Sequence, residues 1–181
     1  MSGATTMSTA LHNSRLIVMA GSGGVGKTTV AAAVALQAAK QGRRVAVLTI
    51  DPARRLAQAL GFDTFTSRLT QVALNPGSTG ELWAMMLDVK STGDAMVRRF
   101  ASSPEVEQAI LDNPYYGYFS TSLAGSQEYM AVEQVRALIE DQNFDLVVLD
   151  TPPAQNALDF FDAPDRLIDG LRRIPINAIG G

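Results

Sequence analysis

A glycine-rich segment followed by lysine and threonine has the residue types that bind phosphate. Residues 21–28 read Gly-Ser-Gly-Gly-Val-Gly-Lys-Thr, which matches the pattern G-x-x-x-x-G-K-[ST]. Glycines let the backbone turn sharply and bring its N–H groups close to an anion, because no Cβ is in the way. Lys27 is suited to supply a charge to the β- and γ-phosphates, and Thr28 a hydroxyl to Mg²⁺. The predicted phosphate-contacting residues are Gly23, Gly24, Val25, Gly26, Lys27, Thr28 and Thr29.

Two aspartates end apolar runs and are candidates for the same chemistry. Asp150 ends the run 144–150, which is where a carboxylate that holds Mg²⁺ or its water shell is found in such sites. Asp51 ends a second apolar run and precedes Pro52; it could act as the base or the orienting group for an attacking water. The alternatives are a simple strand-terminal turn at Asp150 and an Asx-type turn at Asp51.

The elements that must position these residues alternate between strand and helix. Short apolar runs predict strands, and an Ala-rich stretch with Gly42 placed to stop it predicts a helix. The predicted strands cover 15–20, 45–50, 81–88 and 144–150, and the predicted helices begin with 27–41 and 53–60. This order indicates an α/β fold with a parallel sheet flanked by helices. Ligands bind at the carboxyl ends of such strands, where the glycine loop and both aspartates fall.

The middle of the chain has a helical pattern. Residues 91–141 are predicted to form about three helical pieces cut by Pro104 and Pro114, the last from about 127 to 140. Residues 1–14 are predicted to be a disordered lead-in. Residues 15–181 are predicted to form one nucleotide-binding domain that includes this helical subdomain.

Composition excludes several classes of site. The 181 residues contain no cysteine, so thiolate zinc sites and disulfides cannot form within the chain. The only histidine, His12, lies in a polar N-terminal stretch, so a histidine metal cluster and a Ser-His-Asp triad are not expected. The net charge of −3 and the absence of basic runs argue against nucleic acid as a partner. The apolar runs are too short for an integral membrane segment, and a cytoplasmic location is expected.

Three segments together resemble one family of nucleotide-binding proteins. They are Gly21-Ser-Gly-Gly-Val-Gly-Lys-Thr-Thr29, Thr49-Ile-Asp-Pro-Ala-Arg54 and Val148-Leu-Asp-Thr-Pro-Pro153. The sequence is similar to the arsenite-pump-type (ArsA-like) ATPases, which include the targeting ATPase for tail-anchored membrane proteins. Residues 122–130 resemble a bacterial, actinobacterial-type branch. The glycine loop alone is common to many ATPases, whereas its combination with the other two segments is fairly specific.

The resemblance implies a P-loop NTPase fold of the SIMIBI-like type that binds ATP and Mg²⁺. It also implies a dimer with facing nucleotide sites, in which Asp51 lies in a first switch and residues 150–153 form a second switch. The second switch would move the helical region 91–141, whose apolar side chains could line a groove for an apolar or helical protein client. The alternative is that these side chains form the core of a helical layer. They include Met96, Phe100, Ile110, Tyr115, Tyr116, Tyr118, Phe119, Tyr129 and Met130.

The chain departs from the family pattern in three respects. Ser22 stands where the family usually has a lysine that reaches the partner's nucleotide, which bears on hydrolysis by a homodimer. The lack of cysteine removes the thiolate arsenite site and the Cys-x-x-Cys zinc staple. Family members are also longer, so the chain is expected to be a truncated form with an incomplete sheet.

Three functions agree with these residues. The leading interpretation is an ATP-hydrolysing switch, with Lys27 and Asp51 as catalytic residues, whose nucleotide state controls the binding of a protein partner. A second is a weakly hydrolysing or non-hydrolysing regulatory subunit that pairs with a paralogous ATPase carrying the lysine that Ser22 replaces. A third is a ParA- or MinD-like partitioning ATPase, against which the missing lysine and the lack of a basic patch argue.

Overall fold

The computed structural model describes residues 13–50, 55–62, 66–116 and 126–152. Within these ranges the chain forms two compact units. Residues up to 87 and from 135 onward make a sheet-containing unit, and residues 88–134 make a helical unit.

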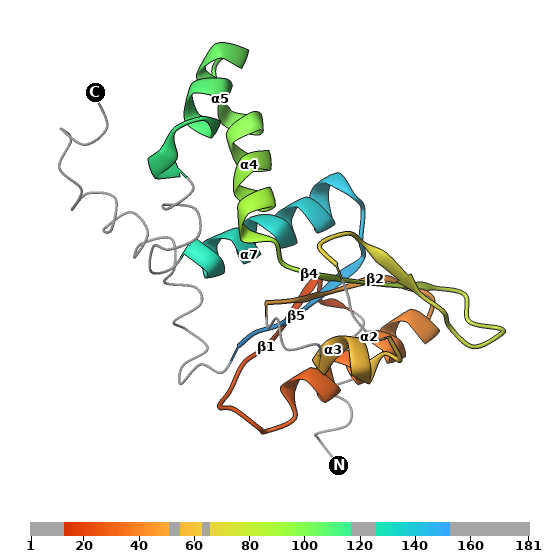
Figure 1. Cartoon of the computed structure of the whole chain (residues 1–181). Helices are drawn as coiled ribbons and strands as arrows, with labels where there is room; N and C mark the ends of the chain where they lie inside the picture. The colour runs from red at the N-terminus through yellow and green to blue at the C-terminus, as the bar shows by residue number, and fades with distance from the viewer. Residues whose placement is uncertain (1–12, 51–54, 63–65, 117–125, 153–181) are drawn as a thin grey trace. The chain divides into compact units, whose positions relative to one another are not determined.

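The sheet-containing unit is built on five strands in the order β1-β5-β2-β4-β3 (Figure 1). β1, β5, β2 and β4 run parallel, and β3 pairs antiparallel with β4 at one edge. The strand bounds are β1 Leu16–Met19, β2 Arg44–Thr49, β3 Thr70–Val72, β4 Glu81–Met86 and β5 Leu146–Asp150. The predicted α/β class with a parallel sheet is therefore confirmed.

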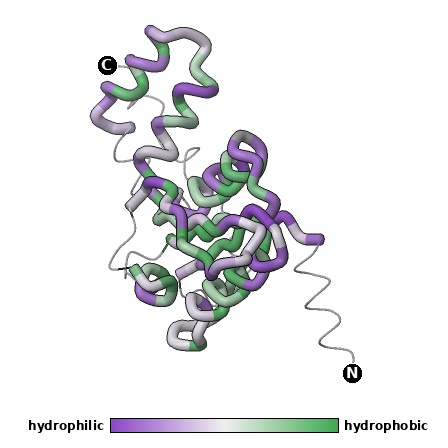
Figure 2. Tube along the Cα trace, turned by 90° about the vertical axis from the view of Figure 1, so that its right-hand side faces the viewer, coloured by the Kyte–Doolittle hydropathy of each residue, from purple (hydrophilic) through white to green (hydrophobic). Residues whose placement is uncertain are grey.

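The burial of the central strands β2 and β5 explains why both could be predicted from their apolar runs. All of β5, and all of β2 after Arg44, is buried, and both are apolar runs of the kind expected for a strand inside a parallel sheet. Figure 2 shows the corresponding hydrophobic segments at the centre of this unit, with hydrophilic segments around them.

β3 was not predicted. The sheet therefore has five strands in the described residues, where the sequence predicted four. It has three residues, of which Val72 is buried and Gln71 is exposed. A strand this short offers too few positions for an alternating pattern to be recognised.

One face of the sheet is covered by α2 (Lys27–Lys40), against which α3 (Arg55–Ala59) packs (Figure 1). The buried side of α2 consists almost entirely of small residues, which lets the helix backbone approach the strands closely. Those residues are Ala31, Ala32, Val34, Ala35, Ala38 and Ala39. Gly42 follows the helix with a φ of 91°, so the predicted stop signal is used.

The helical unit contains α4 (Val89–Phe100), α5 (Pro104–Leu111) and the first residues of α7 (Ser126–Arg136). Asp88 and Ser103 cap α4 and α5, with Pro104 at the start of α5. After α7 the chain continues into a π-helical turn, η1 (Ala137–Asp141), that belongs to the sheet-containing unit and was not predicted.

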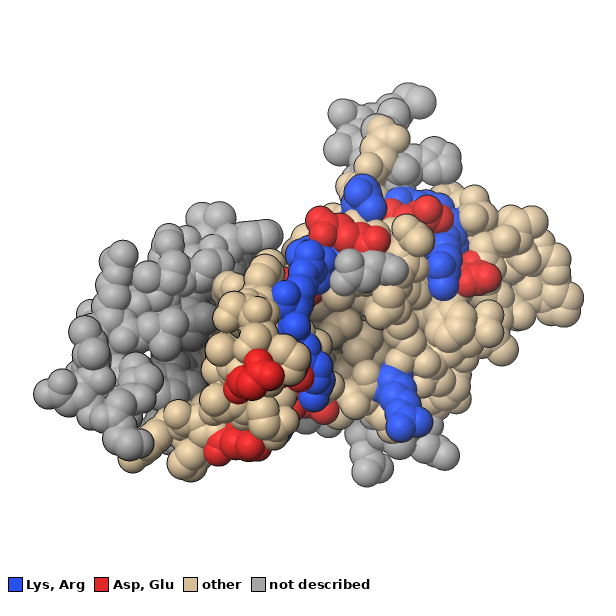
Figure 3. All heavy atoms as spheres, turned by 90° about the horizontal axis from the view of Figure 1, so that it is seen from above, with Lys and Arg blue, Asp and Glu red and all other residues tan. Residues whose placement is uncertain are grey.

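Charges on the helical unit are paired between and along its helices. The ion pairs are Lys90–Asp94, Arg98–Glu107 and Arg99–Glu133. Figure 3 shows blue basic groups beside red acidic groups on the face in view. No helix in the described ranges is long and apolar enough to cross a bilayer.

Candidate functional site

Strand pairing brings the predicted site segments to one edge of the sheet. Met19, the last residue of β1, lies opposite Asp150, the last residue of β5, and Thr49 of β2 lies opposite Asp150 on the other side. The glycine loop begins just after Met19, so it starts beside Asp150. The carboxyl ends of three parallel strands therefore meet where ligands bind in this class of sheet.

The glycine loop has the backbone conformation that its sequence requires. Gly24 has a φ of 79°, and Gly26 has a φ of 87° and a ψ of 15°, both in the left-handed region that side chains with a Cβ rarely adopt. Gly26 is the N-cap of α2 and makes no side-chain cap bond, and the first turn of α2 contains no acidic residue. The N–H groups and positive end of the helix thus have no side-chain anion from this turn.

Lys27 folds back over its own loop. Its Nζ donates hydrogen bonds of 2.8 Å to the carbonyl oxygens of Gly21 and Ser22. These two bonds hold the ammonium group over the start of the loop. The predicted phosphate-contacting residues Gly23 and Val25 lie in this loop and are exposed, Val25 by 61%.

Thr28 and Asp150 are joined across the site. The Thr28 hydroxyl donates to Asp150 Oδ2 at 2.9 Å, and the Thr49 hydroxyl donates to the same oxygen at 3.3 Å. Asp150 is 1% exposed, so its carboxylate is held inside the protein by these contacts. The sequence predicts Thr28 and Asp150 at one site, and the structure brings them into direct contact. The contact of Thr49 with Asp150 was not predicted from the sequence.

Thr151 ties the segment after β5 to the end of β1. Its hydroxyl donates to the Met19 carbonyl at 2.7 Å, and its N–H donates to the same oxygen at 3.4 Å. Pro153, the end of the predicted second switch, lies outside the described residues, as do Asp51 and its neighbours Pro52 and Ala53.

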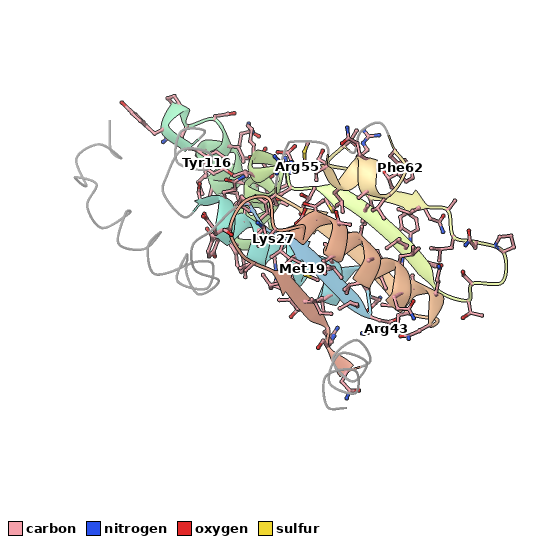
Figure 4. The ribbon with its side chains drawn as sticks, turned by 90° about the horizontal axis from the view of Figure 1, so that it is seen from below. Met19, Lys27, Arg43, Arg55, Phe62 and Tyr116 are labelled. Carbon is pink, nitrogen blue, oxygen red and sulfur yellow. The ribbon has the colours of Figure 1, made fainter. Side chains whose placement is uncertain are left out.

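A cleft of about 520 Å³ opens beside the start of α2. Its lining joins the loop and α2 to one face of α3, and Figure 4 labels the two cations that line it, Lys27 and Arg55. The lining residues are Gly24, Gly26, Lys27, Thr28, Thr29, Arg55, Gln58 and Ala59. The last three were missed from the sequence; their spacing of three and four residues is the signal of one helix face.

The sequence of the chain matches a known protein family over most of its length. A model of the anion-transporting ATPase family matches residues 14–178. The chain belongs to this family.

Individual relatives, two of which are named as ATPases, agree with this assignment. An uncharacterized protein of Streptomyces coelicolor is 34% identical over 88% of the chain and 40% of its own length. The ATPase ASNA1 homolog of Dictyostelium discoideum is 32% identical over 87% of the chain and 44% of its own length. The ATPase get3 of Schizosaccharomyces japonicus is 30% identical over 87% of the chain and 46% of its own length. The chain thus spans less than half the length of these relatives. The resemblance to arsenite-pump-type ATPases is confirmed, and it is favoured over the partitioning-ATPase alternative.

The oxygen donors of this ATPase-family chain suit Mg²⁺. Magnesium prefers hard oxygen ligands and is commonly bound through one or two carboxylates together with substrate phosphates and waters. Thr28 and Asp150 supply a hydroxyl and a carboxylate 2.9 Å apart. Within the described ranges no group of three or more His, Cys, Asp or Glu residues could hold a metal ion by itself. Thr28 and Asp150 are the described residues that would hold a metal at this place.

Proposed function

We propose that the protein is a Mg²⁺-dependent ATPase whose nucleotide state controls the binding of a protein partner. The observation that carries the proposal is the contact between the buried Asp150 carboxylate and Thr28, which lines the cleft together with Lys27. Family membership supports ATP as the nucleotide. A cytoplasmic location, which the sequence predicts, stays a prediction.

Binding uses the glycine loop and the start of α2. The N–H groups around Gly24 and Gly26 and the positive end of α2 stabilise an anion. Lys27 exchanges its bonds to the loop carbonyls for bonds to the phosphates, which carry more negative charge than a carbonyl. Thr28 and Asp150 would hold Mg²⁺, which would neutralise charge on the phosphate oxygens.

Hydrolysis requires a water placed in line with the terminal phosphate. Asp51 follows the end of β2 by two residues, and Thr49 of β2 is directly opposite Asp150 in the sheet. The proposal assigns Asp51 to orienting that water and to accepting its proton. Lys27 stabilises the charge that develops on the phosphate oxygens.

Calorimetric titration of Mg²⁺-ATP into the Lys27→Ala variant tests the binding site. We expect no measurable binding, because the variant loses the cation that reaches the phosphates. Lys40→Ala is the matched control, since Lys40 is an exposed lysine at the other end of the same helix, and it should bind as the wild type does. ATP affinity retained by Lys27→Ala would rule out the loop assignment.

The partner site is proposed in the helical unit. Phe100 is 69% exposed and Tyr115 is 59% exposed, which fits a surface that contacts an apolar client. Met130 is 5% exposed and belongs to the core, so it is removed from the predicted groove. Tyr118 and Phe119 lie outside the described residues.

A crosslinking experiment tests the partner site. A photoreactive apolar helical peptide should label the helical unit to different extents with Mg²⁺-ADP and with a nonhydrolysable triphosphate. A Phe100→Ser variant should be labelled less. The control is Val30→Ser, which removes an exposed apolar side chain from the other unit at a position outside the predicted phosphate-contacting residues. Equal labelling in both nucleotide states would contradict the gating proposal.

A regulatory subunit is the second candidate function, and Ser22 is the observation that favours it. A paralogous ATPase that carries lysine at this position could complete the site of this chain, whereas this chain could not complete the site of the paralogue. Mixing the two proteins should then raise phosphate release well above the sum of the separate rates. An additive rate would count against this pairing.

A further inference from the structure

A second cation lines the same cleft as Lys27. Arg55 is the first residue of α3, it is exposed, and it shares the cleft of about 520 Å³ with Lys27 and Thr28 (Figure 4). None of the residues that line this cleft within the described ranges is acidic. Two positive side chains that line one cleft are each suited to contact a polyanion.

The packing of α3 explains why Arg55 lines the cleft. Leu56 and Ala57 are each 2% exposed and belong to the same apolar core as the buried alanines of α2. Burial of these two residues fixes the rotation of the short helix. Its remaining face, with Arg55, Gln58 and Ala59, then lines the cleft.

We propose that Arg55 is a phosphate-binding residue of the nucleotide site, a role that rests on the proposed function because it needs the same bound nucleotide. The guanidinium group is planar and offers paired N–H donors that match two oxygens of a phosphate group. Arg55 therefore adds a directional contact from α3 to the point charge that Lys27 supplies from α2. Gln58, one turn further on, offers a neutral amide beside it.

Calorimetry with Mg²⁺-ATP and with Mg²⁺-tripolyphosphate tests this role. Arg55→Ala should weaken both ligands by about 10-fold to 100-fold, the loss expected for one hydrogen bond to a charged group. Arg55→Lys should recover part of the affinity, because it restores the charge without the paired geometry. Arg68→Ala is the matched control: Arg68 is an exposed arginine of the same unit that does not line the cleft, and it should bind both ligands normally.

Salt dependence gives a second readout that a structural role would not change. Removing a phosphate-bound cation should make ATP affinity fall less steeply with salt in Arg55→Ala than in the wild type or Arg68→Ala. Circular dichroism should show that the variants are folded. If Arg55→Ala does not fold, Arg55→Gln replaces it in both measurements.

The outcomes separate this inference from the proposed function. Loss of ATP affinity without loss of tripolyphosphate affinity would assign Arg55 to the nucleoside and overturn the phosphate role. Unchanged binding of both ligands in a folded Arg55 variant would also overturn it, while leaving the loop assignment intact. If the wild-type protein binds neither ligand, the proposed function itself fails.

Discussion

At the scale of single residues, Lys27 and Asp150 each already hold partners inside the protein. Lys27 donates to two loop carbonyls, and Asp150 accepts from two threonine hydroxyls. At these two side chains, ligand binding must therefore exchange existing hydrogen bonds. The net gain per exchanged bond is modest, about 0.5–1.5 kcal/mol for a neutral bond and about 1.5–3 kcal/mol for a bond to a charged group.

Asp51 is the residue whose role belongs to turnover and not to binding. We expect Asp51→Asn to bind Mg²⁺-ATP with nearly wild-type affinity, because the phosphate contacts come from the loop and α2. Phosphate release should fall by about 10²-fold or more, since the amide cannot accept the proton of the attacking water. Calorimetry and a phosphate-release assay on the same sample separate the two effects. Wild-type turnover in this variant would remove Asp51 from its role.

Tyr116 is predicted to make the helical unit sensitive to alkaline pH. Burial, with the negative charge of Asp94 as a further cause, raises the pKa of Tyr116 to about 12 from its ordinary value of 10.0, and Arg98 opposes the shift. Because the folded state holds the phenol proton more tightly, the stability this contributes is fully present below pH 10 and is lost as the pH rises toward 12.

Alkaline titration followed by tyrosinate absorbance measures this shift. The difference between the wild type and Tyr116→Phe should contain one tyrosine that ionises near pH 12. If the tyrosine that Tyr116→Phe lacks instead ionises near pH 10 in the wild type, the Tyr116 side chain is solvated as a free phenol.

At the scale of elements, Gly80 shows how closely the segments around α2 approach one another. A Cβ at this position would lie 2.3 Å from the Ala39 carbonyl oxygen, 2.4 Å from the Arg43 carbonyl oxygen and 2.8 Å from the Arg43 nitrogen. These atoms are all backbone, so they cannot move aside as the end of a side chain could. The turn before β4 is therefore packed directly against the turn that joins α2 to β2.

Gly80→Ala should destabilise the sheet-containing unit by about 1–3 kcal/mol or more, the usual cost of overpacking. Gly77→Ala is the control, because Gly77 has a φ of 93° but open space around its Cβ position. Its cost should be limited to backbone strain of about 1–2 kcal/mol. Urea denaturation compares the two, and a loss in Gly80→Ala no greater than in Gly77→Ala would contradict the close approach.

The elements also show which information the sequence carries locally. β2, β5 and α2 were predictable because a buried parallel strand is an unbroken apolar run and a helix close to a sheet is rich in alanine. The glycine loop was predictable because its phosphate chemistry restricts residue types at fixed spacing. Arg55 and Gln58 were not, because α3 has five residues and only its packing on α2 determines which face lines the cleft. The site roles themselves stay predictions.

At the scale of the whole molecule, nucleotide is predicted to control association. The family resemblance implies two facing sites, so Mg²⁺ with a nonhydrolysable triphosphate should double the mass measured by light scattering relative to Mg²⁺-ADP. Lys27→Ala should stay at the lower mass in both conditions. A single mass in the wild type, whatever the nucleotide, would contradict the dimer and leave monomeric ATP binding possible.

The sheet order also has a consequence for protein synthesis. Within the described sheet, the strand neighbour of β1 is β5, and the Thr151 hydroxyl that bonds to Met19 is 132 residues further along the chain. A ribosome therefore releases β1 and the glycine loop long before their neighbour emerges, and nascent chains that stop short of β5 should not retain ATP. Non-local pairing of this kind also folds slowly, which leaves the early strands exposed to chaperones and to aggregation during translation.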